Sequence, residues 1–216
     1  DPLLRIEDWW DILLLRDSTF LITGIGNYYD TTLLRWFEKP LKINIDMEGN
    51  ILDYSILYKS IDSIDGAQDF FTVESNSGHL YSAGVTEPLH KTLRKQSLYE
   101  ANPVFFPLSD SLSYAYSLSW MQDSTIVISG TMENPDFWFE QRVEVQIVDT
   151  MGTILHSRRL LDNYTGPYYF VSTTRDNKIL ATGSAEQNPY GPMLNTMLFK
   201  LTSTLEDDVY DPTPRV

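Results

Sequence analysis

Side chains that could bind a metal or act as nucleophiles are few in this chain, and they are scattered. The three histidines, His79, His90 and His156, lie far apart and form no metal-ligand or H-E-x-x-H spacing. Cysteine is absent, which excludes disulfides, thiolate metal sites and a cysteine nucleophile. No G-x-S-x-G motif marks a serine nucleophile either. We therefore expect no metal site, no cofactor and no catalytic nucleophile.

Aromatic residues beside Asn and Asp form a more suggestive set. Five aromatic residues and one aspartate fall in segments that we expect to be surface loops: Tyr28, Tyr29, Asp30, Phe137, Trp138 and Tyr190. Exposed aromatic rings suit carbohydrate or peptide recognition, because they bring a large contact area with little rotamer entropy to lose. These six residues are the candidate ligand-binding residues. The alternative is that their rings pack between neighbouring sheets.

Other tryptophans indicate core packing instead. Four of them lie on or beside stretches that favour strands: Trp9, Trp10, Trp36 and Trp120. A large ring on a strand usually contributes to the core, so we expect these four to be packed inside.

Acidic residues outnumber basic ones by 30 to 16, which gives a net charge of -14. Nucleic acid and anionic membrane surfaces need clustered Lys and Arg, so both are disfavoured as partners. No apolar run approaches the roughly 20 residues that span a bilayer, and we expect no direct membrane insertion. Asp62 and Asp65 lie three apart in a loop and could bind calcium, although a solvated loop is the simpler interpretation.

The elements that must position these residues follow from a repeated motif. A polar turn, a mostly apolar run and a glycine recur four times, as "RDSTFLITG", "NSGHLYSAG", "QDSTIVISG" and "RDNKILATG". The motif glycines are Gly24, Gly84, Gly130 and Gly183. Their spacing of about 50 residues matches the period of four-stranded propeller blades.

Each unit is expected to be four antiparallel strands joined as a meander. In two units a second tight turn opens on Asp46 or Asp149 and closes on Gly49 or Gly152. No stretch shows a 3.6-residue apolar period over a dozen residues, so the chain is predicted to be all-β. Repetition favours a β-propeller of about four four-stranded blades over a β-sandwich.

The predicted organisation is a propeller, or a propeller fragment, over residues 1–206 and an acidic, Pro-containing tail or linker over residues 207–216. The second unit lacks the Asp turn and carries Pro103 and Pro107, which cannot lie inside a central strand. The fourth unit stops before its outer strand. The ring would close within this chain if residues 2–6 paired with residues 197–201. The alternative is that further blades complete a larger ring.

Alternate connections of a meander lie at opposite ends of the strands. All short turns should therefore share one face of the disc, and all long connections the other. The six candidate residues belong to long connections between second and third strands. We expect them on the face opposite the short turns.

The pattern D-x-x-Φ-Φ-x-[ST]-G, followed by Φ-x-Φ-D-x-x-G-x-Φ, resembles repeats of propeller-containing proteins secreted by Bacteroidetes. The closing segment "LEDDVYDPTP" is similar to stretches that often precede the C-terminal sorting domain of type IX secretion substrates, and that domain itself is not in this sequence. The resemblance runs from Trp9 to about Pro214. It implies the propeller fold and a secreted or cell-surface location.

The sequence favours a non-enzymatic binding module that recognises a glycan, a peptide or a partner protein through its long-loop face. The alternative is a propeller glycoside hydrolase, which would need two carboxylates around the central channel. Asp8, Asp11 and Asp69 lie just before or in the predicted inner strands, where such a channel would gather them. A third interpretation is a structural spacer that holds neighbouring domains.

Overall fold

The computed structural model describes residues 4–32, 34–56, 68–86, 90–97, 104–107, 114–134, 137–160, 169–186 and 194–208. These residues form an all-β fold. The described ranges contain no helix that could span a membrane.

The described residues form fifteen strands in four antiparallel sheets, which we call blades 1 to 4. Blade 1 holds β1 (Leu4–Leu14), β2 (Phe20–Asp30), β3 (Arg35–Ile45) and β4 (Ile51–Ile56). Blade 2 holds β5 (Gln68–Glu74), β6 (His79–Thr86), β7 (His90–Ser97) and β8 (Val104–Pro107). Blade 3 holds β9 (Tyr114–Trp120), β10 (Ile126–Asn134), β11 (Phe137–Val148) and β12 (Ile154–Arg159). Blade 4 holds β13 (Tyr169–Thr173), β14 (Ile179–Glu186) and β15 (Leu194–Leu201).

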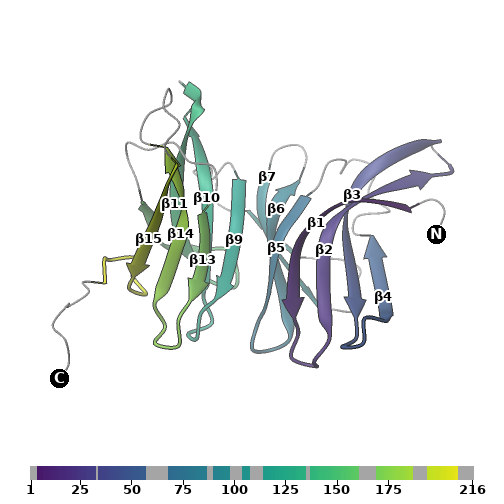
Figure 1. Cartoon of the computed structure of the whole chain (residues 1–216), viewed down its shortest axis with the longest axis horizontal. Coiled ribbons are helices and arrows are strands. Elements are labelled where there is room, and N and C mark those ends of the chain that lie inside the picture. Colours follow the sequence, from purple (N-terminus) through teal and green to yellow (C-terminus); the bar gives the residue numbers. More distant parts are fainter. Residues whose placement is uncertain are drawn as a thin grey trace.

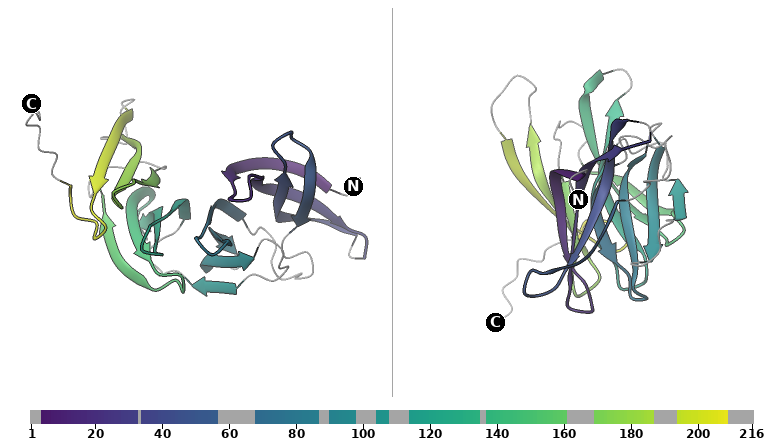
Figure 2. Two further views of the ribbon diagram at one scale, coloured as in Figure 1. Left: turned by 90° about the horizontal axis from the view of Figure 1, so that it is seen from below. Right: turned by 90° about the vertical axis from the view of Figure 1, so that its right-hand side faces the viewer.

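Every blade is a meander, because strands that follow one another along the chain are neighbours in the sheet. The first strands of successive blades, β1, β5, β9 and β13, contact one another in that order. The blades stand side by side (Figure 1), and the view from below shows them along an open arc (Figure 2, left). This is the arrangement of propeller blades around an axis, as the repeat predicts.

The four motif glycines occupy equivalent places, which confirms the repeat. Gly24, Gly84, Gly130 and Gly183 lie in the second strands of the four blades, on β2, β6, β10 and β14. In the first three blades the inner strand carries one extra residue beside the partner of the glycine, and all three extra residues are aromatic: Trp10, Phe70 and Tyr116. A glycine inside a strand commonly marks such a β-bulge. The motif therefore ends on glycine where the inner strand bulges.

The Asp turns also form as predicted. Asp46 Oδ1 accepts hydrogen bonds from the backbone N–H groups of Glu48 (3.0 Å) and Asn50 (2.7 Å), while Gly49 adopts a φ of 86°. The hydrogen bond from the Asn50 side chain, together with these backbone bonds, lowers the pKa of the Asp46 carboxyl. "DMEGN" is thus a hairpin turn, with its oxygens used locally.

Core residues lie in layers between the blades. Within β10, Ile126 and Ile128 pack toward blade 2 and Val127 packs toward blade 4, as the two-residue period of a strand dictates. The cluster between blades 1 and 2 is smaller, with Leu15, Leu21 and Leu80 as its buried members. Among the described residues, the apolar cluster is therefore smallest at the joint between blades 1 and 2.

Closure of the ring by the two ends of this chain is a wrong prediction. Residues Leu4 to Ile6 pair with β2 of their own blade and not with β15. The far edge of β15 pairs at Leu201 with Asp207, just beyond the turn that follows the strand. Blades 1 and 4 form the two ends of the arc, well apart (Figures 1 and 2).

The two irregular units fold as their sequences indicate. Pro107 ends β8, which is the outer edge strand of blade 2, where a missing N–H interrupts no central ladder. Blade 4 has three strands among the described residues.

Candidate functional site

The candidate binding residues that the structure describes lie on strands rather than in loops. Tyr28, Tyr29 and Asp30 are the last three residues of β2, and Phe137 and Trp138 are the first two of β11. Tyr190 lies outside the described residues. Aromatic side chains favour the pleated surface of a strand, so the expected long connections are continued as hairpin ladders. The backbone at these positions is more regular than expected.

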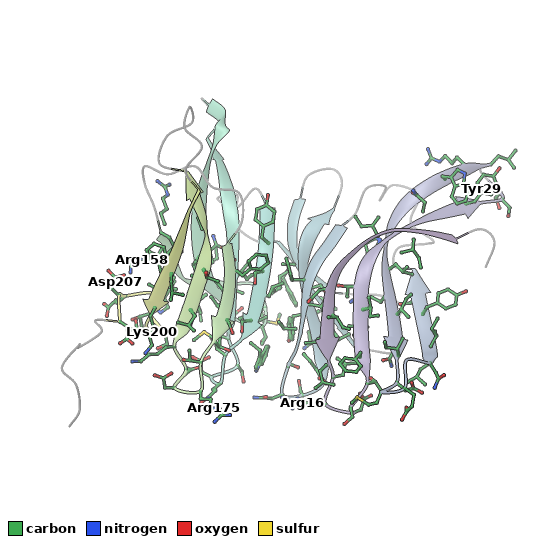
Figure 3. All side chains as sticks on the ribbon, in the orientation of Figure 1. Arg16, Tyr29, Arg158, Arg175, Lys200 and Asp207 are labelled. Carbon is green, nitrogen blue, oxygen red and sulfur yellow. The ribbon has the colours of Figure 1, made fainter. Side chains whose placement is uncertain are left out.

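The β2–β3 hairpin projects beyond the rest of blade 1. Its ladder runs without a shift from the Phe20–Ile45 pair to the Asp30–Arg35 pair. The turn that follows contains Leu34, an exposed residue with a φ of 54°. Figure 3 shows Tyr29 near the free end of this hairpin, away from Arg16 in the β1–β2 turn. The hairpin therefore extends on the side opposite the short turns.

Tyr29 and Trp36 form an aromatic pair across this hairpin. They are direct partners in the β2–β3 ladder, and their ring centroids lie 5.2 Å apart with an interplanar angle of 57°. Trp36 is 39% exposed and Tyr29 is half-buried. The expectation that Trp36 belongs to the core is wrong, because it lies next to the last pair of the β2–β3 ladder and is exposed there. Trp36 pairs with the candidate residue Tyr29, so recognising the β2–β3 hairpin in the sequence would have added Trp36 to the candidate binding residues.

A second hairpin, β10–β11, ends in the Asn134–Phe137 pair and carries Trp138. Figure 1 shows both hairpins extending away from the short turns, on blades 1 and 3, with blade 2 between them. The structure therefore does not bring Tyr29 and Trp138 into one cluster. The side chains of Tyr28, Asp30, Phe137 and Trp138 lie outside the described part, and their roles stay predictions.

The inner strands of blades 1 and 3 each carry a polar residue that bonds to the next blade. Asp11 and Ser117 are equivalent, since each pairs with the residue before its motif glycine. Asp11 Oδ2 accepts a hydrogen bond from the backbone N–H of Thr72 in the next blade (3.3 Å), and Ser117 Oγ accepts one from that of Val171 (3.2 Å). Burial raises the pKa of the Asp11 carboxyl, and backbone hydrogen bonds offset this only in part.

The equivalent position in blades 2 and 4 is aromatic. Phe71 and Phe170 meet edge to face with centroids 5.8 Å apart, although they belong to blades 2 and 4. Asp8 and Asp69, the other channel candidates, have side chains outside the described part. Asp11 is thus a blade-to-blade contact within the described residues.

Metal binding finds no support among the described side chains. No group of three or more His, Asp or Glu gathers there as a metal site would require. His79, His90 and His156 lie on β6, β7 and β12, and Asp62 and Asp65 lie outside the described residues.

Comparison with protein-family models returned no match, and neither did comparison with curated proteins. Solved structures do resemble the chain. A protein of unknown function from Bacteroides caccae is 9% identical, with a TM-score of 0.59 over 93% of this chain and 65% of its own. The β-propeller domain of the Trilobed protease from Pyrococcus furiosus is 8% identical, with a TM-score of 0.51 over 92% of this chain and 54% of its own.

An α-L-arabinofuranosidase from Lactobacillus brevis is 9% identical, with a TM-score of 0.51 over 94% of this chain and 75% of its own. The chain thus spans less than two thirds of the Bacteroides and Pyrococcus chains. At these identities the similarity concerns the fold. The chain has a β-propeller fold, in agreement with its sheets and their order.

Proposed function

We propose that this chain is a non-enzymatic binding module of an exported, secreted or cell-surface protein, and that it recognises a glycan through the β2–β3 hairpin. The observation that carries the proposal is the solvent-accessible Tyr29–Trp36 pair at the projecting end of that hairpin. Aromatic side chains offer an apolar face with a polar handle, which suits the mixed surface of a sugar ring. The continuous hydrogen-bonded ladder below the pair already orders the hairpin, so binding costs less conformational entropy.

Two further observations support this proposal. The arabinofuranosidase that shares the fold acts on a saccharide, and the Bacteroides protein is in keeping with the resemblance to exported Bacteroidetes propellers. Type IX secretion belongs to the same proposal and rests on the closing segment alone. A peptide or a partner protein is the other ligand class that such a surface would accept.

Substitution of Trp36 tests the proposal. Wild type and variants are screened on a glycan array that includes arabinan, and each hit is measured by calorimetry. Trp36→Ala should weaken binding by about 1–3 kcal/mol, a roughly 5- to 150-fold rise in Kd, while Trp36→Phe should retain most affinity. Met151→Ala is the matched control, because this exposed residue lies in a turn of blade 3 on the opposite side.

Thermal unfolding distinguishes a lost ligand contact from a loss of folding stability. Trp36→Ala should leave the midpoint close to that of wild type, because the residue is 39% exposed and lies next to the last pair of the hairpin ladder. An affinity unchanged by this substitution would contradict the proposed surface. Trp138→Ala, measured in the same two assays, tests whether the second hairpin takes part. A loss of about 3–5 kcal/mol in stability would instead assign Trp138 to the core.

A glycoside hydrolase is the second candidate, and the raised pKa of Asp11 is the observation that favours it. A raised pKa suits a general acid, although a partner carboxylate is required as well. Release of reducing sugar from polysaccharides by wild type, abolished in Asp11→Asn, would support the hydrolase over the binding module.

A further inference from the structure

The β2–β3 hairpin has two faces, and the aromatic pair lies on the face that is turned to blade 2. Lys42 on β3 pairs with Thr23 on β2, and its Nζ lies 3.4 Å from Ser82 Oγ of blade 2. Side chains alternate along a strand, so every second residue of β2 shares the face of Thr23. These residues are Thr23, Ile25, Asn27 and Tyr29. The face of Tyr29 is therefore the continuation of the joint between blades 1 and 2.

Burial along this face decreases from the joint to the tip of the hairpin. Thr23 and Ile25 are 1% and 4% exposed. Asn27 and Tyr29 are half-buried, and Trp36, the ladder partner of Tyr29, is 39% exposed. The same face thus packs inside the protein at one end and meets solvent at the other.

The different lengths of the two hairpins explain this decrease. The β6–β7 ladder of blade 2 ends two positions after Gly84, whereas the β2–β3 ladder continues for six positions after Gly24. The Tyr29–Trp36 pair lies three positions beyond the level at which the blade 2 ladder ends, which is about 10 Å along the strand. Figure 1 shows the hairpin curving away from blade 2 toward its free end.

A side-chain amide lies next to the aromatic pair on this face. Asn27 is two positions from Tyr29 on β2, and the ladder between them has no register shift. Side chains two positions apart on a strand point to the same side. An amide both donates and accepts hydrogen bonds, as does each hydroxyl group of a sugar. The two rings and Asn27 therefore offer apolar contact and hydrogen bonds on one surface.

Formal charges on this face balance, which favours a neutral ligand. Arg5 on β1 and Glu38 on β3 are the ladder partners of Asn27, so this row of the sheet carries no net charge. Arg35 precedes Trp36 by one position on β3 and therefore belongs to the opposite face. The chain as a whole has a net charge of -14, which disfavours an acidic ligand.

We propose that the ligand is a neutral glycan that binds on the blade 2 side of the hairpin, with a sugar ring against Trp36 and a hydroxyl group hydrogen-bonded to Asn27. This inference rests on the proposed glycan-binding role of the hairpin, and it adds the face, the polar contact and the ligand class. Continuity with the joint identifies the face, since the alternation that buries Thr23 and Ile25 also brings Asn27 and Tyr29 to that side. The Arg35 side of the hairpin takes no part.

Calorimetry with the tightest-binding neutral oligosaccharide from the glycan array tests the face. Asn27→Ala should raise Kd roughly 3- to 10-fold, as expected for the loss of one hydrogen bond. Asn27→Asp keeps the shape of the side chain and removes its N–H donors, so it should weaken binding as well. Arg35→Gln is the matched control from the opposite face and should leave Kd unchanged. A Kd unchanged in both Asn27 variants, or raised equally in Arg35→Gln, would overturn the proposed face.

Thermal unfolding accompanies these measurements and verifies that each variant is folded at the assay temperature. The isosteric Asn27→Asp decides the matter if the alanine variant is unstable.

Deoxy analogues of the same oligosaccharide test the polar contact. Wild type should bind the analogue that lacks the contacted hydroxyl group more weakly, because the Asn27 amide then loses its partner. Asn27→Ala should bind this analogue and the parent about equally. Discrimination by Asn27→Ala as strong as that of wild type, at every hydroxyl group, would overturn the contact.

The glycan array tests the ligand class, with neutral, uronic-acid-containing and sulfated oligosaccharides side by side. Neutral glycans should bind, and their affinity should change little with salt concentration. A preference for acidic glycans would overturn the ligand class and leave the result for Trp36 standing. By contrast, the absence of any glycan ligand, or a Kd unchanged in Trp36→Ala, would contradict the proposed function itself. The two failures are therefore distinguishable.

Discussion

Replacement of Gly152 by alanine should destabilise the protein more than the same replacement at Gly49. Both glycines close an Asp turn, and their φ angles are nearly equal, 80° and 86°. An alanine in this backbone region costs about 1–2 kcal/mol at either position. It also restricts the unfolded chain equally at both. These two contributions therefore cancel when the variants are compared.

The surroundings of the two glycines differ. A Cβ at Gly152 would lie 2.6 Å from the Cβ and 3.7 Å from the Cα of Phe106, whereas a Cβ at Gly49 meets nothing within 4 Å. Carbon atoms pack at about 3.5–4.0 Å, so the new methyl would be roughly 1 Å too close to β8. Phe106 Cβ is fixed to the strand backbone and cannot rotate away. Overpacking of this kind costs about 1–3 kcal/mol, which is the expected extra loss for Gly152→Ala.

Urea denaturation of wild type and both variants gives the two losses directly. The extra loss at Gly152 should also lower the thermal midpoint by roughly 2–4 °C per kcal/mol in a chain of this size. The m-value should stay constant, so that the change reports the folded state. Equal losses at the two positions would refute the reasoning, because only Gly152 has blade 2 against it.

Two substitutions on the inner strands, at Asp11 of β1 and Ser117 of β9, have predictable effects on stability. Asp11→Asn keeps an oxygen for the Thr72 N–H and removes the buried charge. The pKa of Asp11 is raised in the folded state, so its contribution to folding stability is present at low pH and is lost as the pH rises through that pKa. The variant should therefore lose less stability than wild type between acidic and neutral pH. Denaturation across that pH range measures this, and a profile identical to wild type would contradict it. Ser117→Ala leaves the Val171 N–H without its buried acceptor and should cost about 1–3 kcal/mol, measured by the same denaturation at neutral pH. A loss below the error of that measurement would show that the contact is dispensable.

The sequence predicts the strands and turns well because those signals are local. The motif glycines, the Asp turns and the edge proline Pro107 each act within a few residues, and the structure places them as expected. The projecting hairpin could not be read in the same way. "GNYYDTT" combines strand-forming tyrosines with turn-forming polar residues, and only its pairing with Trp36 and its neighbours decides that the strand continues.

The inner bulges could not be predicted either. Trp10, Phe70 and Tyr116 each precede an inner-strand residue that pairs next to a glycine, but sequence alone does not give the register of the partner strand. Once the register is known, the motif glycine and the aromatic residue form one repeated unit. The aromatic residue at this place is therefore the additional signal by which further blades of this type could be recognised.

Burial is the property least accessible from sequence, because in a propeller it depends on the neighbouring blade. Ile12 and Val171 are both β-branched apolar residues at the same register position of an inner strand, yet the first is exposed and the second is buried. Leu198 and Val145 show the same contrast on the opposite faces. A repeat gives every blade the same pattern of apolar residues on its two faces. The pattern therefore indicates how neighbouring blades pack, but not whether a given face has a neighbour. What covers a blade face is consequently set by the neighbour on that face and not by the repeat itself.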